Sequence, residues 1–353
     1  MIRWICMVLI AGCGTDTPPR DGVQAPASEN FVALDSTADE PGPTAAAPSD
    51  DINPRLLRRF RPVAGSVSTR AKPEMVALGR RLFFDKDLSL HHDVSCNSCH
   101  ALDSFGVDHR KTSRGSDGQT GDRNAPTVFN AATHIAQFWD GRARTIEDQA
   151  SGPILNTREM AMPSEQAVVV RLTASPMYVA AFAAAFAGDG EPISMRHLAG
   201  ALGAFERGLT TTSRWDRYLT GDIAALTPPE KHGLRVFLEV GCMACHTGPQ
   251  VGGTMFQRVG VIEPWPNQHD SGRIGVTKDP ADRMVFKVPT LKNITNTAPY
   301  FHDGSVDDLS TAVKMMARHQ LGIELTGPDV DAIVTWMASL TGTVDPAYIA
   351  PPT

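Results

Sequence analysis

The chain has 353 residues, a length that suggests two domains, or two domains and an appended segment. Hydrophobic residues make up 42% of it, which is enough for buried cores, and 20% of the residues are charged. The formal net charge is −6 and no run is rich in Lys or Arg, so the sequence gives no indication of nucleic-acid binding.

The first twelve residues are typical of a secretion signal, with Arg3 ahead of the apolar run from Trp4 to Ala11. The run ends in Ile-Ala-Gly-Cys13, which resembles a bacterial lipobox, where the Cys is lipidated and becomes the mature N-terminus. Polar residues follow Cys13 at once, which favours the lipobox over an ordinary signal peptide with an unrelated Cys. An acylated N-terminus would hold the protein on a membrane surface without spanning the membrane.

Residues 13–52 are rich in Pro, Ala, Ser, Thr, Asp and Glu and contain few aromatic residues. Because such a composition cannot bury enough apolar surface to fold, we predict a disordered tether here. Ordered structure is expected to begin between Asn53 and Arg61.

A helix is predicted from Pro73 to Phe84, since Pro stands at its start and apolar residues follow at helical spacing. It leads to the run Cys-Asn-Ser-Cys-His at residues 96–100. A second helix, predicted to start at Thr227, leads in the same way to Cys-Met-Ala-Cys-His at residues 242–246. This repeated order indicates an internal duplication.

A Cys-x-x-Cys-His run is the attachment signal of c-type haem: both thiols form thioethers with the porphyrin, and the His binds the iron. Taken singly, a Cys-x-x-Cys pair also occurs in zinc knuckles, redox dithiols and disulfides. Here a His follows each second Cys directly, and the only other cysteines lie in the N-terminal segment. We therefore predict two covalently bound haem c groups, held by Cys96, Cys99, His100, Cys242, Cys245 and His246.

Each half also ends in a predicted amphipathic helix, over residues 194–209 in the first half and residues 329–340 in the second. Few windows alternate as strands do. The sequence thus predicts a mainly α fold with two tandem cytochrome c-like haem domains, residues 53–222 and 223–353. The first domain contains a long insert, residues 106–163, and long loops of this kind are usually functional.

Six further motifs, taken in order, resemble those of the bacterial di-haem cytochrome c peroxidases, whose wider family includes the MauG-like enzymes. They are LGRRLFFD (78–85), RNAPT (123–127), QFWDGRA (137–143), GPI (152–154), EM (159–160) and TAPYFHDG (297–304). The resemblance covers about residues 73–342. It implies two α-helical cytochrome c domains, a calcium ion between them, and reduction of hydrogen peroxide to water.

The resemblance gives the two haems unlike roles. It assigns His100 to a peroxide-reducing haem, and His246 to an electron-storing haem with Met316 as its second ligand. A thioether ligand would exclude peroxide and raise the potential of the iron. Core packing is the commoner role of a methionine, and Met315 is a rival, although successive side chains leave a helix about 100° apart. We interpret His302 as a neighbour of this site and not as a ligand.

On the peroxide side, the resemblance assigns proton transfer to Glu159, pocket lining to Gln149 and electron relay between the haems to Trp139. A carboxylate can act as base and then as acid if it lies within about 3 Å of the bound oxygens. Without the motif, Glu159 would be interpreted as a solvated loop residue and Trp139 as a core aromatic.

Calcium is assigned, again by resemblance, to the side chain of Asn124 and the backbone carbonyls of Thr297 and Pro299, which are oxygen donors suited to a hard cation. The resemblance also implies a homodimer, and a small cytochrome c or a cupredoxin as electron donor. The signal sequence and the haem motifs place the protein in the periplasm, and the lipobox would attach it to a bacterial membrane through Cys13.

One position departs from the family. In much of the family, a His in the loop after the first haem motif binds the resting iron and leaves it when the other haem is reduced. The matching position here is Ser116, and a neutral hydroxyl is a poor ligand for ferric haem. The closed state should therefore be lost, with the loop 113–123 mobile or held away from the iron, unless the nearby His109 takes over.

Two other functions stay open at this point. A MauG-like oxidase of a partner protein's side chains is favoured by the unblocked peroxide site but disfavoured by Met316, because MauG-like enzymes tend to have Tyr as that ligand. A non-enzymatic di-haem electron carrier is disfavoured by Glu159 and by the long insert.

Overall fold

The computed structural model describes residues 52–63 and 71–352. The expected signal sequence, the lipidated Cys13 and all but the last residue of the expected tether lie outside these described residues.

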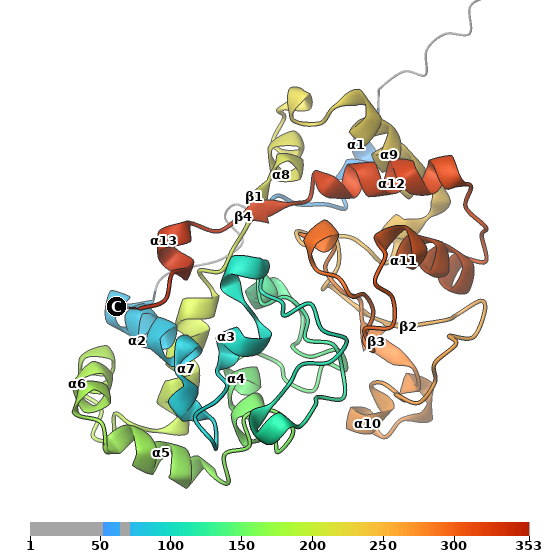
Figure 1. The fold of residues 1–353 in the computed structure, drawn as a ribbon. Helices are drawn as coiled ribbons and strands as arrows, with labels where there is room; N and C mark the ends of the chain where they lie inside the picture. The colour runs from blue at the N-terminus through green and yellow to red at the C-terminus, as the bar shows by residue number, and fades with distance from the viewer. Residues whose placement is uncertain (1–51, 64–70, 353) are drawn as a thin grey trace, which may run out of the picture. The chain divides into compact units, whose positions relative to one another are not determined.

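Helices dominate the described part of the chain, whose strands form two small antiparallel pairs, β1–β4 and β2–β3 (Figure 1). The mainly α fold is therefore confirmed. The α-helices are α1 (Pro54–Leu57), α2 (Pro73–Phe84), α3 (Cys96–Cys99), α4 (Ile146–Leu155), α5 (Glu165–Thr173), α6 (Pro176–Ala185), α7 (Met195–Glu206), α8 (Arg214–Leu219), α9 (Pro228–Val240), α10 (Ile274–Thr277), α11 (Leu309–Met316), α12 (Gly327–Ala338) and α13 (Pro346–Ile349). The strands are β1 (Thr212–Ser213), β2 (Phe256–Arg258), β3 (Val285–Lys287) and β4 (Gly342–Thr343).

The helices that lead to the two haem motifs begin where the sequence predicts them. Helix α2 spans the predicted residues, with Pro73 in its first turn. Helix α9 starts behind Thr227, whose backbone N–H donates to the Glu230 carboxylate at 2.8 Å while the Thr227 hydroxyl caps the N–H of Glu230. This reciprocal capping satisfies two backbone N–H groups that have no partner within the helix.

Two hydrophobic cores are built in the same way. In the first, α2 crosses α7 so closely that a Cβ atom at Gly79 would lie 1.9 Å from the carbonyl oxygen of Ala201. In the second, α9 crosses α12, and a Cβ atom at Gly233 would lie 1.9 Å from the carbonyl oxygen of Ala332. Figure 1 shows α2 beside α7 and α9 beside α12. Both crossings need a residue without a side chain, which agrees with the expected duplication.

The ends of the chain exchange between these cores. Phe60, near the N-terminal end of the described chain, packs with Trp215 in the second core. Val344 and Tyr348, near the C-terminus, pack in or against the first core. Strand β1 pairs with β4 where the chain crosses. The packing therefore departs from a simple division after residue 222, because the terminal segments bury their apolar side chains in the opposite half.

No single helix in the described residues is both long and apolar enough to cross a membrane. Helices α5 and α6, bent by 104° at their junction, meet that standard only as a pair, by length and composition.

Candidate active site

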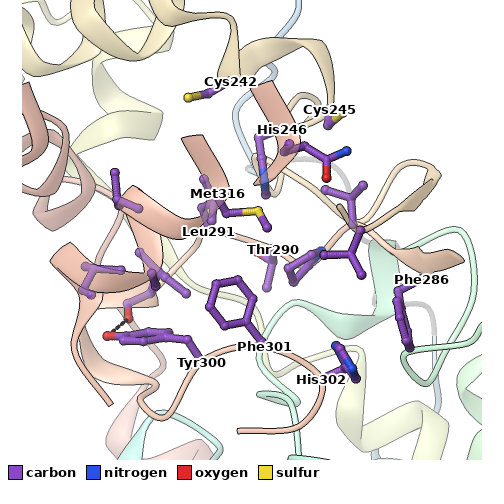
Figure 2. Close-up of a pocket in the computed structure, with 18 of the residues that line it drawn as sticks. Cys242, Cys245, His246, Phe286, Thr290, Leu291, Tyr300, Phe301, His302 and Met316 are labelled. Carbon is purple, nitrogen blue, oxygen red and sulfur yellow. Dashed lines mark hydrogen bonds between the residues drawn. The ribbon is translucent and has the colours of Figure 1, made fainter. Parts of the chain in front are cut away.

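The second Cys-x-x-Cys-His motif lies on the wall of an apolar cavity of about 210 Å³. Helix α9 ends at Gly241, whose left-handed backbone (φ 100°) turns the chain so that Cys242, Cys245 and His246 face this cavity. Figure 2 shows the His246 ring and the Met316 side chain pointing into it. The two predicted ligands of this site are thus brought together from segments 70 residues apart in sequence.

Helix α11 ends at Met316 and continues as a π-helix, Ala317–Leu321. Such π turns are rare and often occur at functional sites. Met316 lines the cavity, whereas its rival Met315 packs against the cluster around Tyr300. His302 also lines the cavity, but its ring stacks on Phe286 with centroids 4.1 Å apart, away from His246 in Figure 2.

The residues around the second motif fit a haem c. Burial lowers the pKa of His246 to about 4, so its imidazole is neutral at pH 7. Its Nδ1 lies 3.2 Å from the carbonyl oxygen of Val251 and donates to it, which leaves Nε2 for iron. Much of the remaining wall is aliphatic or aromatic, as a porphyrin face requires. These residues include Phe237, Leu291, Ile294, Leu309, Val313 and Ile333.

The first motif lies on the short helix α3, directly after a cap in which Ser95 N donates to Ser98 Oγ at 2.9 Å. His100 follows at the end of this helix, and burial lowers its pKa, so its imidazole is also neutral. Its buried Nδ1 has no hydrogen-bond partner among the described residues. A neutral imidazole next to two thiols fits the expected haem here as well.

Glu159 lies within electrostatic reach of the first motif. Burial is the main cause of the raised pKa of Cys96 and of Cys99, and the charge of Glu159 adds to both. Burial also raises the pKa of Glu159 itself, against the charge of Arg142 and a hydrogen bond from Asn156 Nδ2 to Glu159 Oε1 at 2.8 Å. A positioned carboxyl with a raised pKa is suited to proton transfer near neutral pH.

Trp139 lies where the two halves of the chain meet. Its indole Nε1 donates to the carbonyl oxygen of Asn124 at 2.9 Å, and its own carbonyl accepts from the backbone N–H of Lys287 in β3 at 2.7 Å. Its side chain lines the cavity of the second motif. Gln149 lies half-buried on α4, the helix that precedes Glu159. The roles of Trp139 and Gln149 stay predictions.

The three predicted calcium ligands, Asn124, Thr297 and Pro299, lie on the wall of the same cavity. The Asn124 amide nitrogen donates to the carbonyl of Arg110 at 3.0 Å, which leaves its Oδ1 to act as a cation ligand. No cluster of three or more His, Cys, Asp or Glu side chains fit to hold a metal occurs in residues 52–63 and 71–352. A cation at this place would thus depend on amide and carbonyl oxygens.

The loop that carries Ser116 is anchored. Ser116 is fully buried and its hydroxyl donates to Asp93 Oδ1 at 2.8 Å. His109, the expected substitute ligand, has both ring nitrogens engaged, with Nδ1 2.9 Å from the carbonyl oxygen of Ala298 and Nε2 2.8 Å from Ser104 Oγ. In this conformation His109 has no ring nitrogen left for an iron.

Two buried ionisable residues near the motifs were not predicted. Glu206, at the end of α7, is 7% exposed; burial raises its pKa to about 8, and its charge acts on Cys96. Lys287 is 7% exposed, burial lowers its pKa to about 8, and its Nζ donates to the carbonyl oxygen of Ala136 at 2.8 Å. The available signals were a Glu directly after the core residue Phe205 and a Lys inside an apolar run.

The whole chain was compared with known proteins. The family model of the di-haem cytochrome c peroxidases matches residues 73–224. The cytochrome c551 peroxidase of Pseudomonas aeruginosa is 41% identical over 309 residues, which cover 85% of this chain and 89% of that protein. This chain belongs to the di-haem cytochrome c peroxidase family. Membership implies two haem c groups, which agrees with the two motifs.

Two further relatives support this membership. The cytochrome c551 peroxidase of Nitrosomonas europaea is 44% identical over 276 residues, 78% of this chain and 82% of that protein. Among solved structures, a MauG-like protein associated with microbial copper homeostasis is 29% identical, with a TM-score of 0.72 over 80% of this chain and 94% of that chain. The family predicted from the six motifs is therefore confirmed.

Proposed function

We propose that this di-haem peroxidase reduces hydrogen peroxide to water at the first motif, with electrons delivered through the second. The observation that carries the proposal is Glu159, a half-buried carboxyl with a raised pKa that a hydrogen bond from Asn156 holds near the cysteines of the first motif. Reduction of one peroxide consumes two electrons and two protons, so a nearby group that exchanges protons is required.

At the first site, Cys96, Cys99 and His100 would hold the haem. When bound, the haems supply iron that changes oxidation state, which is the electron chemistry that this reaction needs. Glu159 would accept a proton from one oxygen of peroxide and return it to the other, which general acid–base catalysis by one carboxyl allows. Gln149 would line the pocket.

At the second site, His246 and Met316 would occupy the two axial positions. A thioether and an imidazole leave no room for peroxide, so this site stores an electron and does not bind substrate. Trp139 would relay electrons, since it joins the first half of the chain to the cavity wall around the second motif. His302, packed on Phe286 in the same cavity, would shape the pocket without binding iron.

The surroundings of this activity are also proposed. Electrons would come from a small cytochrome c or a cupredoxin, and the protein would work in the periplasm as a homodimer attached to the membrane through a lipidated Cys13. A calcium ion bound by Asn124, Thr297 and Pro299 would lie where the halves meet. The relatives named cytochrome c551 peroxidase support a cytochrome as donor.

A MauG-like activity on a partner protein is the second candidate, supported by the structural similarity to a MauG-like protein. Met316 argues against it, because the MauG-like enzymes tend to have Tyr at this position. Steady-state consumption of peroxide with a reduced cytochrome c separates these functions. We expect rapid consumption that oxidises the cytochrome stoichiometrically. Consumption independent of the cytochrome would favour the MauG-like function, and no consumption would leave only an electron carrier.

The same assay tests the absence of the switching His. With Ser116 at that position and both His109 nitrogens engaged, the fully oxidised protein should react with peroxide without pre-reduction. Electron paramagnetic resonance should show a high-spin or water-ligated first haem. Two low-spin signals, one of bis-His type that disappears in His109→Ala, would show instead that His109 closes the site.

A further inference from the structure

We propose that Asp93 is a positioning residue: through Ser116 it clasps the loop 113–121 and so fixes the backbone of Glu159. This inference rests on the proposed role of Glu159 in peroxide reduction. Asp93 lies in the segment before the first haem motif, and Ser116 in the loop after it, so the clasp joins the chain across the motif.

The clasp has three hydrogen bonds at its centre. The Asp93 carboxylate accepts from Ser116 Oγ at 2.8 Å through one oxygen and from the backbone N–H of Asp117 at 3.2 Å through the other. The hydroxyl of Ser89 donates to the first oxygen at 3.3 Å. Bonds to an ionised carboxylate are stronger than those between neutral groups. The pKa of Asp93 agrees with this account, since these bonds lower it although burial acts to raise it.

The same serine connects the clasp to Glu159. The backbone N–H of Ser116 donates to the carbonyl oxygen of Glu159 at 2.6 Å, and the N–H of Leu90 donates to the neighbouring carbonyl of Met160 at 2.8 Å. Both segments that Asp93 ties together are therefore bonded to the turn that carries the proposed catalytic carboxyl. Asn156 alone holds the Glu159 side chain by a hydrogen bond in the described residues, so its direction depends on this backbone.

The loop also packs on this turn without slack. A Cβ atom at Gly115 would lie 2.1 Å from the carbonyl oxygen of Arg158 and 2.6 Å from that of Glu159. The loop is closed on itself by the bridge between Arg114 and Thr120, so it moves as a unit. A break at Asp93 should thus release the whole loop, and the backbone of Glu159 with it.

Hydrogen–deuterium exchange of the haem-loaded, full-length protein tests the clasp without reference to activity. In Asp93→Ala, the backbone amides of residues 114–121 should exchange about tenfold faster, the effect of losing one or two charge-assisted hydrogen bonds. Ser116→Ala should give a similar acceleration, and the double variant no more than the larger single effect, because both substitutions break one interaction. Asp93→Asn keeps one acceptor and should lie between.

Peroxide kinetics test the positioning. Asp93→Ala should lower kcat by about tenfold and leave KM for peroxide unchanged, since misplacement of a catalytic group affects the chemical step. Thr120→Ala in the same loop and Asp103→Ala, both at exposed residues outside the clasp, are the matched controls and should leave exchange and kcat unchanged. Unchanged haem absorption in every variant shows that folding is intact.

Wild-type exchange rates in Asp93→Ala would overturn the clasp. Faster exchange with an unaltered kcat would overturn the positioning of Glu159. A wild-type protein without peroxide turnover would instead refute the proposed function, and the exchange measurement would still decide whether the clasp exists.

Discussion

The two Cys-x-x-Cys-His motifs share one pattern but lie in different surroundings. Around the first, the carboxylates of Glu159 and Glu206 act on Cys96, and burial is joined by charge in raising its pKa. Around the second, burial raises the pKa of Cys242 to about 11 with no carboxylate contributing, and the wall is largely aliphatic and aromatic.

This difference separates attachment from function. The motif supplies two thiols and an imidazole in both places, and burial keeps both His100 and His246 neutral. What distinguishes the sites comes from elsewhere in the chain: a carboxyl that can exchange protons at the first, and a thioether in an apolar wall at the second. The surroundings, and not the motif, suit one site to peroxide chemistry and the other to electron storage.

The largest effect should come from removing the attachment itself. Mass spectrometry of the wild-type protein should find two covalent haems, and Cys242→Ala with Cys245→Ala should find one and abolish peroxide turnover. The matching pair, Cys96→Ala with Cys99→Ala, should do the same at the other site. Zinc at either motif, or a wild-type protein with a single haem, would end this comparison.

Removal of the proton-exchanging group should break the first site alone. Glu159→Gln keeps the shape of the side chain but not its titrating proton, and should lower peroxide turnover by about two to four orders of magnitude with both haems retained. Glu165→Gln, at an exposed position of α5, is the control. Near-normal turnover in Glu159→Gln would refute the assigned role.

The pH profile of the wild-type protein gives a second measure of Glu159. A base must be ionised, so kcat should fall as the pH drops through the pKa of Glu159, which burial raises above the ordinary glutamate value. The acid limb should therefore lie at higher pH than that of a solvated carboxylate, and it should be absent from the residual activity of Glu159→Gln.

Loss of the thioether should make the second site resemble the first. Met316→Ala should convert that haem to a form that binds added ligands and has a lower potential, while Met315→Ala, which removes a side chain packed outside the cavity, should not. Near-infrared absorption of the Met-to-iron bond is the measurement. If this band survives in Met316→Ala, another residue is the ligand.

The smallest effect concerns what the two halves have in common. Gly79→Ala and Gly233→Ala each insert a methyl group against a backbone carbonyl at a helix crossing, so each should lower the free energy of unfolding by about 1–3 kcal/mol. Gly190→Ala, in open space, is the control. Chemical denaturation measures all three, and clearly unequal effects at Gly79 and Gly233 would show that the two cores are less alike than their geometry suggests.

Local sequence determined the helices and the attachment points. Pro73, Thr227 and Ser194 start or cap their helices in the structure because capping acts within one turn, and the haem motifs are five consecutive residues. The family, and with it the candidate roles of Glu159 and Met316, followed from six short motifs in order. Interactions of this range can be read from the chain without knowing how it folds.

Only the tertiary structure decided which distant residues meet. The choice between Met315 and Met316 depends on which side of α11 faces the cavity, and the engagement of His109 depends on Ala298, 189 residues away. Phe60 packs in the second core, and Asp93 meets Ser116 across the first motif. These contacts join segments far apart in the chain, and because no local periodicity or spacing encodes them, they exist only once the two halves have packed together.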